Sequence, residues 1–181
     1  MNCSATLTAI AGQCGKVLGG ITKFYVINRD KINPPTVSNG AITEITLNTT
    51  GTPTQGDGFI EYAFRKNTAN VVTTGNADDS GRNNSFSTVA TLEFSKQETA
   101  KRVGLQALIE TDAYAVYEDR NHKRWLMGYD EAISANVNGE SGSAPTDVNK
   151  YVLTVTDQSL ELPYEVTMTD EAFEALLDEN L

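Results

Sequence analysis

The sequence predicts a single, mainly β domain with one internal helix, and three observations support this. The chain has 181 residues, which suits one domain with a core of its own. Residues that favour strands and turns, such as Thr, Val, Asn and Gly, are prominent, whereas helix formers are not. Several segments alternate apolar and polar residues, which is the period of a half-buried strand, and only one internal segment has the period of a helix.

Residues 1–21 are expected to form an N-terminal arm. Glycines recur from position 12 to position 20 and interrupt any regular element. The arm is nevertheless too apolar for a solvated tail, because it contains Leu7, Ile10, Val17 and Leu18. We expect it to dock either on its own domain or, preferably, on a neighbouring molecule.

Residues 22–166 are expected to form the β domain, whose first half has three strand signals. Thr22 to Asn28 is rich in aromatic and β-branched residues. Asn33-Pro34-Pro35 is expected to stop this strand, because proline cannot donate a hydrogen bond to a ladder. Ala41 to Asn48 alternates strictly between two faces. Phe59 to Thr73 is the longest strand-like stretch and is expected to form one strand.

One segment predicts a helix that flanks the strands. Ser95-Lys96-Gln97-Glu98 matches a capping box, in which the serine and the glutamate satisfy free backbone donors at the start of a helix. Apolar residues then recur at helical spacing at Ala100, Val103, Ala107 and Leu108, and Leu105 and Ile109 widen this stripe. Thr111-Asp112 is expected to end the helix.

The second half of the domain has further strand signals. Ser85 to Phe94 places alternate apolar residues on one face. Ala113–Glu118 and Arg124–Tyr129 flank the polar turn Asp119–Lys123, which predicts a β-hairpin. Later strands are expected at Glu131–Asn138, Asn149–Thr156 and Leu160–Val166.

Residues 167–181 are expected to form a short acidic helix or tail. Phe173, Leu176 and Leu177 line one side of the segment from Thr169 to Leu181, and acidic residues cover the rest. Such a short helix is marginal alone in water, so it must either pack on something or stay partly disordered.

No residue pattern predicts catalysis, so the chain is not expected to be an enzyme, and no catalytic, cofactor-binding or metal-site residue is assigned. His122 is the single histidine and lies in the expected hairpin turn among charged residues, where an exposed turn residue is the simpler interpretation. Asp78-Asp79 lies in a Gly/Asn-rich loop that lacks the ordered ligand spacing of a calcium loop. Cys3 and Cys14 match no metal motif.

The formal net charge of -10 makes the chain poorly suited to gripping nucleic acid, which needs clustered Lys and Arg. It suits either a surface past which DNA slides or simple solubility. The sequence shows no basic and then strongly apolar leader, and no run of about 20 apolar residues. We therefore expect a soluble protein that is made in the cytoplasm and has no membrane partner.

The middle of the chain resembles the tail tube proteins of long-tailed bacteriophages, particularly phages that infect Bacteroidetes-type hosts. The resemblance runs from Gly58 to Val166 and is one of pattern and order. After the helix, an acidic-basic turn precedes an aromatic residue and a glycine, as in this family. The segments that carry the resemblance are Phe59–Lys66, Asn84–Thr88, Thr91–Phe94, Glu98–Val103, Val116–Gly128 and Tyr151–Thr156.

The resemblance implies a β-sandwich or barrel with one flanking helix, in a structural protein of the virion. Six copies would form a ring whose inner strands close into a continuous β-barrel, and rings would stack into the tail tube through which the genome passes. The partners would be other copies of the chain, other tail proteins and, transiently and without specificity, DNA. A negative lumen would repel the DNA phosphates, and the loops Asn48–Asp57 and Asn76–Asn84 would reach neighbouring rings. The protein would reside in the virion tail after assembly in the host cytoplasm.

Two other functions stay open. One is a different ring component of the virion, such as a tail terminator, a baseplate ring or a connector, which would form a single ring. The other is a glycan-binding β-sandwich module, which would use exposed aromatic residues and would behave as a monomer.

Overall fold

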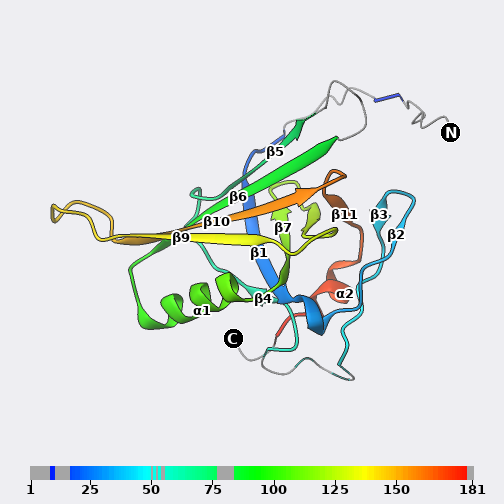
Figure 1. Ribbon diagram of the computed structural model, residues 1–181, viewed down its shortest axis with the longest axis horizontal. Helices are drawn as coiled ribbons and strands as arrows, with labels where there is room; N and C mark the ends of the chain where they lie inside the picture. The colour runs from blue at the N-terminus through cyan, green and yellow to red at the C-terminus, as the bar shows by residue number, and fades with distance from the viewer. Residues whose placement is uncertain are drawn as a thin grey trace.

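The computed structural model describes residues 9–10, 17–49, 51, 53, 56–76 and 84–178. It contains two β-sheets of seven and four strands, one helix of three turns and a short helix near the C-terminus (Figure 1). The mainly β fold predicted from the sequence is therefore confirmed.

The seven-stranded sheet has the order β2-β3-β11-β8-β7-β1-β4. Its neighbouring strands are antiparallel, except that β3 and β11 run parallel. Its central strand β7 is buried from residue 113 to residue 118, because both faces of the sheet are covered. The strands are β1 (Ile21–Asn28), β2 (Val37–Ser38), β3 (Ala41–Ile42), β4 (Ile60–Glu61), β7 (Ala113–Asp119), β8 (Arg124–Met127) and β11 (Tyr164–Val166).

The four-stranded sheet has the order β5-β6-β10-β9 and is antiparallel throughout. Its strands are β5 (Asn70–Asn76), β6 (Ser85–Ser95), β9 (Ser134–Glu140) and β10 (Lys150–Ser159). In Figure 1 these strands cross in front of β1 and β7. One face of this sheet lies on the seven-stranded sheet, so the two sheets form a sandwich.

The first hydrophobic core lies between the two sheets. Alternate residues of each strand point into it, as the period of two requires, and helix α1 (Thr99–Glu110) closes one side. Its fully buried members from the two inner strands of the small sheet are Ala90, Leu92, Leu153 and Val155, and Phe24, Ala115 and Met127 face them from the large sheet.

A second core covers the opposite face of the seven-stranded sheet. Helix α2 (Asp170–Glu174) lies over this face, and its Phe173 is 1% exposed between Tyr25 and Phe59. The hydroxyl of Thr169 caps α2 by accepting a hydrogen bond from the Ala172 amide. The segment after residue 166 therefore packs on the domain, although only residues 170–174 are helical and residues 179–181 lie outside the described part.

The predicted flanking helix is confirmed, but its capping box is wrong, and only Leu105 and Leu108 of its predicted apolar stripe are buried. Ser95 is the last residue of β6, and α1 begins after Glu98, which makes no side-chain capping bond. Strand pairing with β10 holds Ser95 in the sheet and so overrides the local cap. The buried face contains Leu105 and Leu108, whereas Val103 is 52% exposed.

One close contact agrees with the orientation of α1, whose buried residues are Leu105 and Leu108. The Tyr62 hydroxyl donates to the Gly104 carbonyl oxygen at 3.0 Å, which brings the Gly104 side of the helix against the sheets. The apolar residues of α1 cover so wide an arc that their spacing alone allowed a different face.

Two predicted strands are wrong in extent. Phe59 to Thr73 is not one strand, because a turn with Asn67 at φ 64° separates β4 from β5 and carries the chain from one sheet to the other. Ala41 to Asn48 is a strand only at Ala41–Ile42. Ile42 and Ile45 are both buried although they lie three positions apart, so strict alternation ends between them.

Most other strands appear close to their predicted positions, including the hairpin of β7 and β8 around the turn at residues 119–123. The predicted segment Leu160–Val166 is a strand only at Tyr164–Val166. Strand β9 begins at Ser134 rather than at Glu131. Most of the predicted N-terminal arm lies outside the described residues. Of its described members, Ile10, Val17 and Leu18 are exposed.

Candidate assembly surface

The outer face of the four-stranded sheet is open to solvent and polar. The strand register aligns its residues in rows that cross all or part of the sheet. One row is Val72, Val89, Thr156 and Ser134, and the next is Asn70, Thr91, Thr154 and Asn136. Hydroxyl, amide and small apolar side chains therefore make up most of this face, and its described positions include no aromatic residue.

The charged residues among the described positions of this face gather at one end. Lys150 Nζ lies 2.9 Å from Glu93 Oε1 and 3.7 Å from Glu140 Oε2. The hydrogen bond to Glu93 raises the pKa of Lys150 above its ordinary value. The cluster thus holds two carboxylates and one ammonium group, and most of the acidic excess of the chain lies on other surfaces.

The two outermost strands of this sheet have one strand neighbour each. Both β5 and β9 are seven residues long, and β5 pairs with β6 alone while β9 pairs with β10 alone in the described part of the chain. Charges, prolines, bulges and a covering helix or loop are what usually protect a sheet edge from pairing with another chain. Among the described residues, α1 lies beside β9, and the two edges have no proline and no charge other than Glu140.

The alternation of hydrogen-bonded and non-bonded pairs along the strands identifies the backbone N–H and C=O groups that face the open edges. The Lys96 amide donates to the Asn149 carbonyl at 2.8 Å, one step beyond the paired residues Ser95 and Lys150. Because antiparallel pairs alternate between bonded and non-bonded, even-numbered residues of β6 bond to β10 and odd-numbered ones face β5. The bond from the Arg65 amide to the Glu93 carbonyl agrees with this phase.

The same alternation applies to the pairing of β5 with β6 and of β9 with β10. It leaves three residues on each edge strand whose N–H and C=O groups point away from the sheet. The free groups belong to Val71, Thr73 and Gly75 on β5, and to Ala135, Val137 and Gly139 on β9. Four of these residues have side chains, and all four lie on the core side of the sheet: Val71, Ala135 and Val137 pack against the first core, and the Thr73 hydroxyl bonds to that of the buried Thr88.

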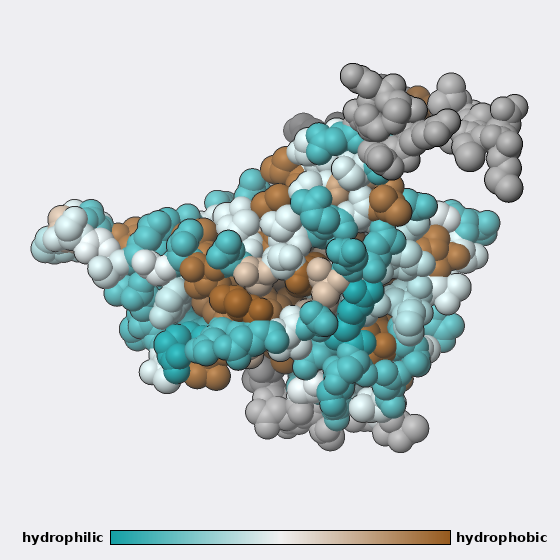
Figure 2. All heavy atoms as spheres, viewed as in Figure 1, coloured by the Kyte–Doolittle hydropathy of each residue, from teal (hydrophilic) through white to brown (hydrophobic). Residues whose placement is uncertain are grey.

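Apolar side chains near the edges are only partly covered. Val71, Ala135 and Val137 pack against the first core but remain partly exposed, because no further strand from the described part of the chain lies beside them. Figure 2 shows apolar surface in the hollow between α1 and the four-stranded sheet. Pairing with another strand would cover more of this surface.

Both edge strands carry a glycine opposite an aromatic residue. A Cβ atom on Gly75 would lie 2.9 Å from Phe86 Cε1, and one on Gly139 would lie 3.2 Å from Tyr151 Cε1. In each case the aromatic residue is the cross-strand partner and covers the glycine.

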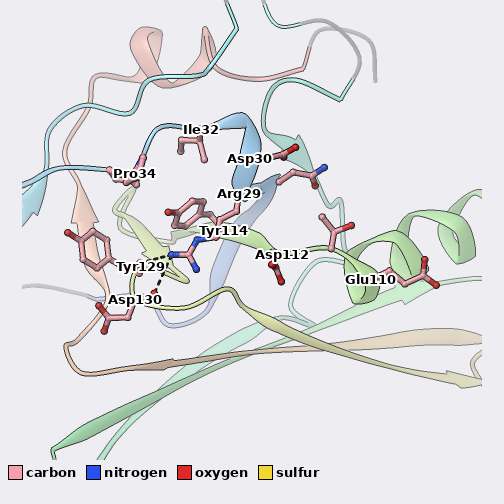
Figure 3. A pocket seen from close by; sticks show the side chains of 12 residues that line it. Arg29, Asp30, Ile32, Pro34, Glu110, Asp112, Tyr114, Tyr129 and Asp130 are labelled. Atoms are coloured by element: carbon pink, nitrogen blue, oxygen red, sulfur yellow. Dashed lines mark hydrogen bonds between the residues drawn. The ribbon is translucent and has the colours of Figure 1, made fainter.

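A separate polar hollow of about 810 Å³ opens beside the ends of β1 and α1 (Figure 3). Arg29 lies over the Tyr114 ring at 4.7 Å and donates to the carbonyl oxygens of Tyr129 and Asp130 at 3.1 and 3.3 Å. The guanidinium group thus ties the end of β1 to the connection after β8. Its contacts are those of a structural residue.

The residues that the sequence singled out do not form a site. His122 is exposed in the β7–β8 turn, with Nδ1 3.6 Å from Glu118 Oε1. Asp78-Asp79, Cys3 and Cys14 lie outside the described residues. Within the described part of the chain, no group of three His, Cys, Asp or Glu residues is placed to hold a metal ion.

The sequence predicted strand edges that ring closure would pair, but it did not predict that β5 and β9 would be the edge strands. Alternation could identify β9 and the later part of the Phe59–Thr73 stretch as strands, but not which strands would lack a second neighbour. The signal that was available is the absence of charge and proline along β5.

No helix among the described residues is both long and apolar enough to cross a membrane. Comparisons with models of protein families, with curated proteins and with solved structures find no match.

Proposed function

We propose that the chain is a structural subunit that closes into a ring through the two edges of its four-stranded sheet, and that such rings stack into the tail tube of a long-tailed phage. The observation that carries this proposal is that β5 and β9, the two edges of one antiparallel sheet, have no second strand neighbour among the described residues. The resemblance of residues 58–166 to tail tube proteins supports the same function.

The strand directions suit closure. An antiparallel sheet with four strands has edge strands that run in opposite directions. Rotation about a ring axis keeps these directions, so β9 of one copy meets β5 of the next as an antiparallel neighbour. The contact is heterologous, and it closes when the rotation divides a full circle.

Closure also decides which face lines the channel. The core face of the sheet is covered by the seven-stranded sheet, whose bulk must lie outside the ring. The open polar face therefore points inwards. Six copies would supply about 24 strands, and barrels of about 16–18 strands already leave an aqueous channel.

DNA passage would depend on the absence of a phosphate-binding surface. Lys150 is the one basic residue among the described positions of the open face, and it is paired with Glu93 and Glu140. Clustered Lys and Arg, which hold phosphates, are missing there. The described positions of such a lumen carry two carboxylates and one ammonium group per copy, which is a weakly negative surface, and the genome would slide past hydroxyl and amide groups. The virion tail would be the location, and other tail proteins would be further partners.

Purified protein examined by negative-stain electron microscopy and mass photometry over a range of concentrations tests the proposal. Striated hollow tubes support it. Rings that never stack would replace the tube by a terminator or connector. A species near 19.6 kDa at every concentration, which also fails to polymerise on a tail-tip complex, would refute both. A glycan-binding module is less well supported, because the described open face has no aromatic platform.

A further inference from the structure

The two free edges are displaced along the strand direction within each copy. Strand β5 is level with residues 85–91 of β6, whereas β9, followed through β10, is level with residues 89–95. The edges are thus offset by four residues, and both are seven residues long. Two copies placed side by side without a shift would pair only the ends of these strands.

We propose that neighbouring copies join with a stagger of four residues, which pairs β9 with β5 over their whole length. This inference rests on the proposed ring and specifies its seam. In this register Ala135 faces Gly75, Val137 faces Thr73 and Gly139 faces Val71. These are the residues with free backbone groups on each edge, and each pair can exchange two hydrogen bonds.

Other registers use the edges less well. A one-residue change would turn the polar face of one copy towards the core side of the next, so only even staggers are allowed. Staggers of two or six residues leave two facing pairs with free groups instead of three. The four-residue stagger therefore gives the most hydrogen bonds, about six per seam.

Barrel geometry independently favours the same stagger. Four strands and a shift of four residues per copy make the shear equal to the strand number, whatever the number of copies. A barrel with that ratio tilts its strands by about 36°, which lies within the usual range of about 35–45°. Staggers of two and six residues correspond to about 20° and about 47° by the same relation.

The seam also places charges favourably. Glu140, whose side chain is 58% exposed, would face Asn70 of the next copy. The preceding turn of that copy carries Arg65 and Lys66, which are exposed and have no ion pair among the described residues. The acidic end of β9 and this basic turn would then attract each other.

Disulfide trapping can read the register directly. On a Cys3→Ser, Cys14→Ser background, Asn136→Cys is combined in turn with Asn70→Cys, Val72→Cys, Thr74→Cys or Asn76→Cys. These pairs report staggers of zero, two, four and six residues. All the side chains lie on the open face. Two strands separate the positions within one copy, so a disulfide can form only between copies.

We expect the Asn136→Cys, Thr74→Cys protein to give a ladder of covalent oligomers on mild oxidation, because facing non-bonded pairs have Cα atoms about 4.5 Å apart. The Val72 and Asn76 positions would be diagonal neighbours at about 7–8 Å, and the Asn70 position would lie about 13 Å along the strand from the facing residue. These three pairs should give at most a tenth of that product. Asn136→Cys alone controls for unspecific oxidation.

Electron microscopy of the same samples separates the two proposals. Rings with a ladder from a different cysteine pair would overturn the four-residue register and leave the ring in place. Rings without a ladder from any pair would overturn the β5–β9 seam. Absence of both rings and ladders would overturn the seam together with the proposed function.

Discussion

Phe173 offers a test of how the C-terminal segment is built into the fold. Its ring is 1% exposed and lies 5.3 Å from the Tyr25 ring and 5.4 Å from the Phe59 ring, measured between centroids. The guanidinium carbon of Arg124 lies 4.7 Å from the centre of the same ring. Phe173→Ala therefore removes a fully buried aromatic group, two aromatic contacts and a cation–π contact.

The expected loss in the free energy of unfolding is about 4 kcal/mol, since burial and cavity costs for Phe→Ala are about 3–5 kcal/mol. That is a large part of the roughly 5–15 kcal/mol that holds a domain together. With a urea dependence of about 2 kcal/mol per molar, the midpoint should fall by about 2 M.

Urea unfolding followed by circular dichroism, at a concentration where the protein is monomeric, measures this shift. Val103→Ala is the matched control, because Val103 is 52% exposed on α1 and its truncation should cost less than about 1 kcal/mol. A loss for Phe173→Ala no larger than that of the control would show that α2 is not part of the second core.

Three further predictions concern backbone strain, a buried carboxyl and the free edges. Gly128→Ala should destabilise the fold by about 1–3 kcal/mol, because Gly128 has φ 90° and a Cβ atom would lie 3.2 Å from the Ala113 carbonyl oxygen; an unchanged thermal midpoint would contradict this. Burial raises the pKa of Asp157 above its ordinary value although the Gly128 amide donates to it, so the folded protein retains a proton that the unfolded chain has lost. The stability of wild type relative to Asp157→Asn should therefore fall as pH rises from 3.8 through the folded pKa. A stability difference in urea titrations that does not change with pH would refute the assignment. Ala135→Pro removes an N–H that faces the free edge, whereas Asn136→Pro removes one that bonds to β10. Ala135→Pro should block assembly with little effect on the thermal midpoint of the monomer, and Asn136→Pro should lower that midpoint. Equal effects on the midpoint would show that the wrong residues of β9 were assigned to the free edge.

Strands whose burial alternates along their own length could be predicted from the sequence. Ser85–Ser95 and Lys150–Ser159 each present one face to the first core and the other to solvent. Their apolar and polar residues therefore alternate, and this local pattern is enough to predict a strand. The β7–β8 hairpin was also predictable, because a polar turn separates two apolar runs.

Features that depend on tertiary packing could not be predicted in this way. Ser95 has the sequence of a helix cap but is recruited by strand β10, and Asn67 interrupts an apparently continuous strand because the chain must change sheets there. The buried face of α1 depends on its packing, in which Leu105 and Leu108 join the first core and Tyr62 bonds to Gly104.

The candidate assembly surface shows the same division. The composition of β5 and β9 is visible in the sequence, but their places at the two edges depend on the pairing of β6 with β10. Paired residues of these two strands are at least 55 positions apart in the sequence. Long-range pairing of this kind leaves no local periodicity.

Hydrogen–deuterium exchange of the edge strands tests the central claim most directly. Assembled and monomeric protein would be compared by mass spectrometry of the peptides that cover Asn70–Asn76 and Ser134–Glu140. The ring predicts that the free amides of Val71, Thr73 and Gly75 on β5, and of Ala135, Val137 and Gly139 on β9, exchange rapidly in the monomer and become protected on assembly, while the β6 and β10 amides change little. Assemblies in which both edge strands exchange as fast as in the monomer would contradict closure through these edges.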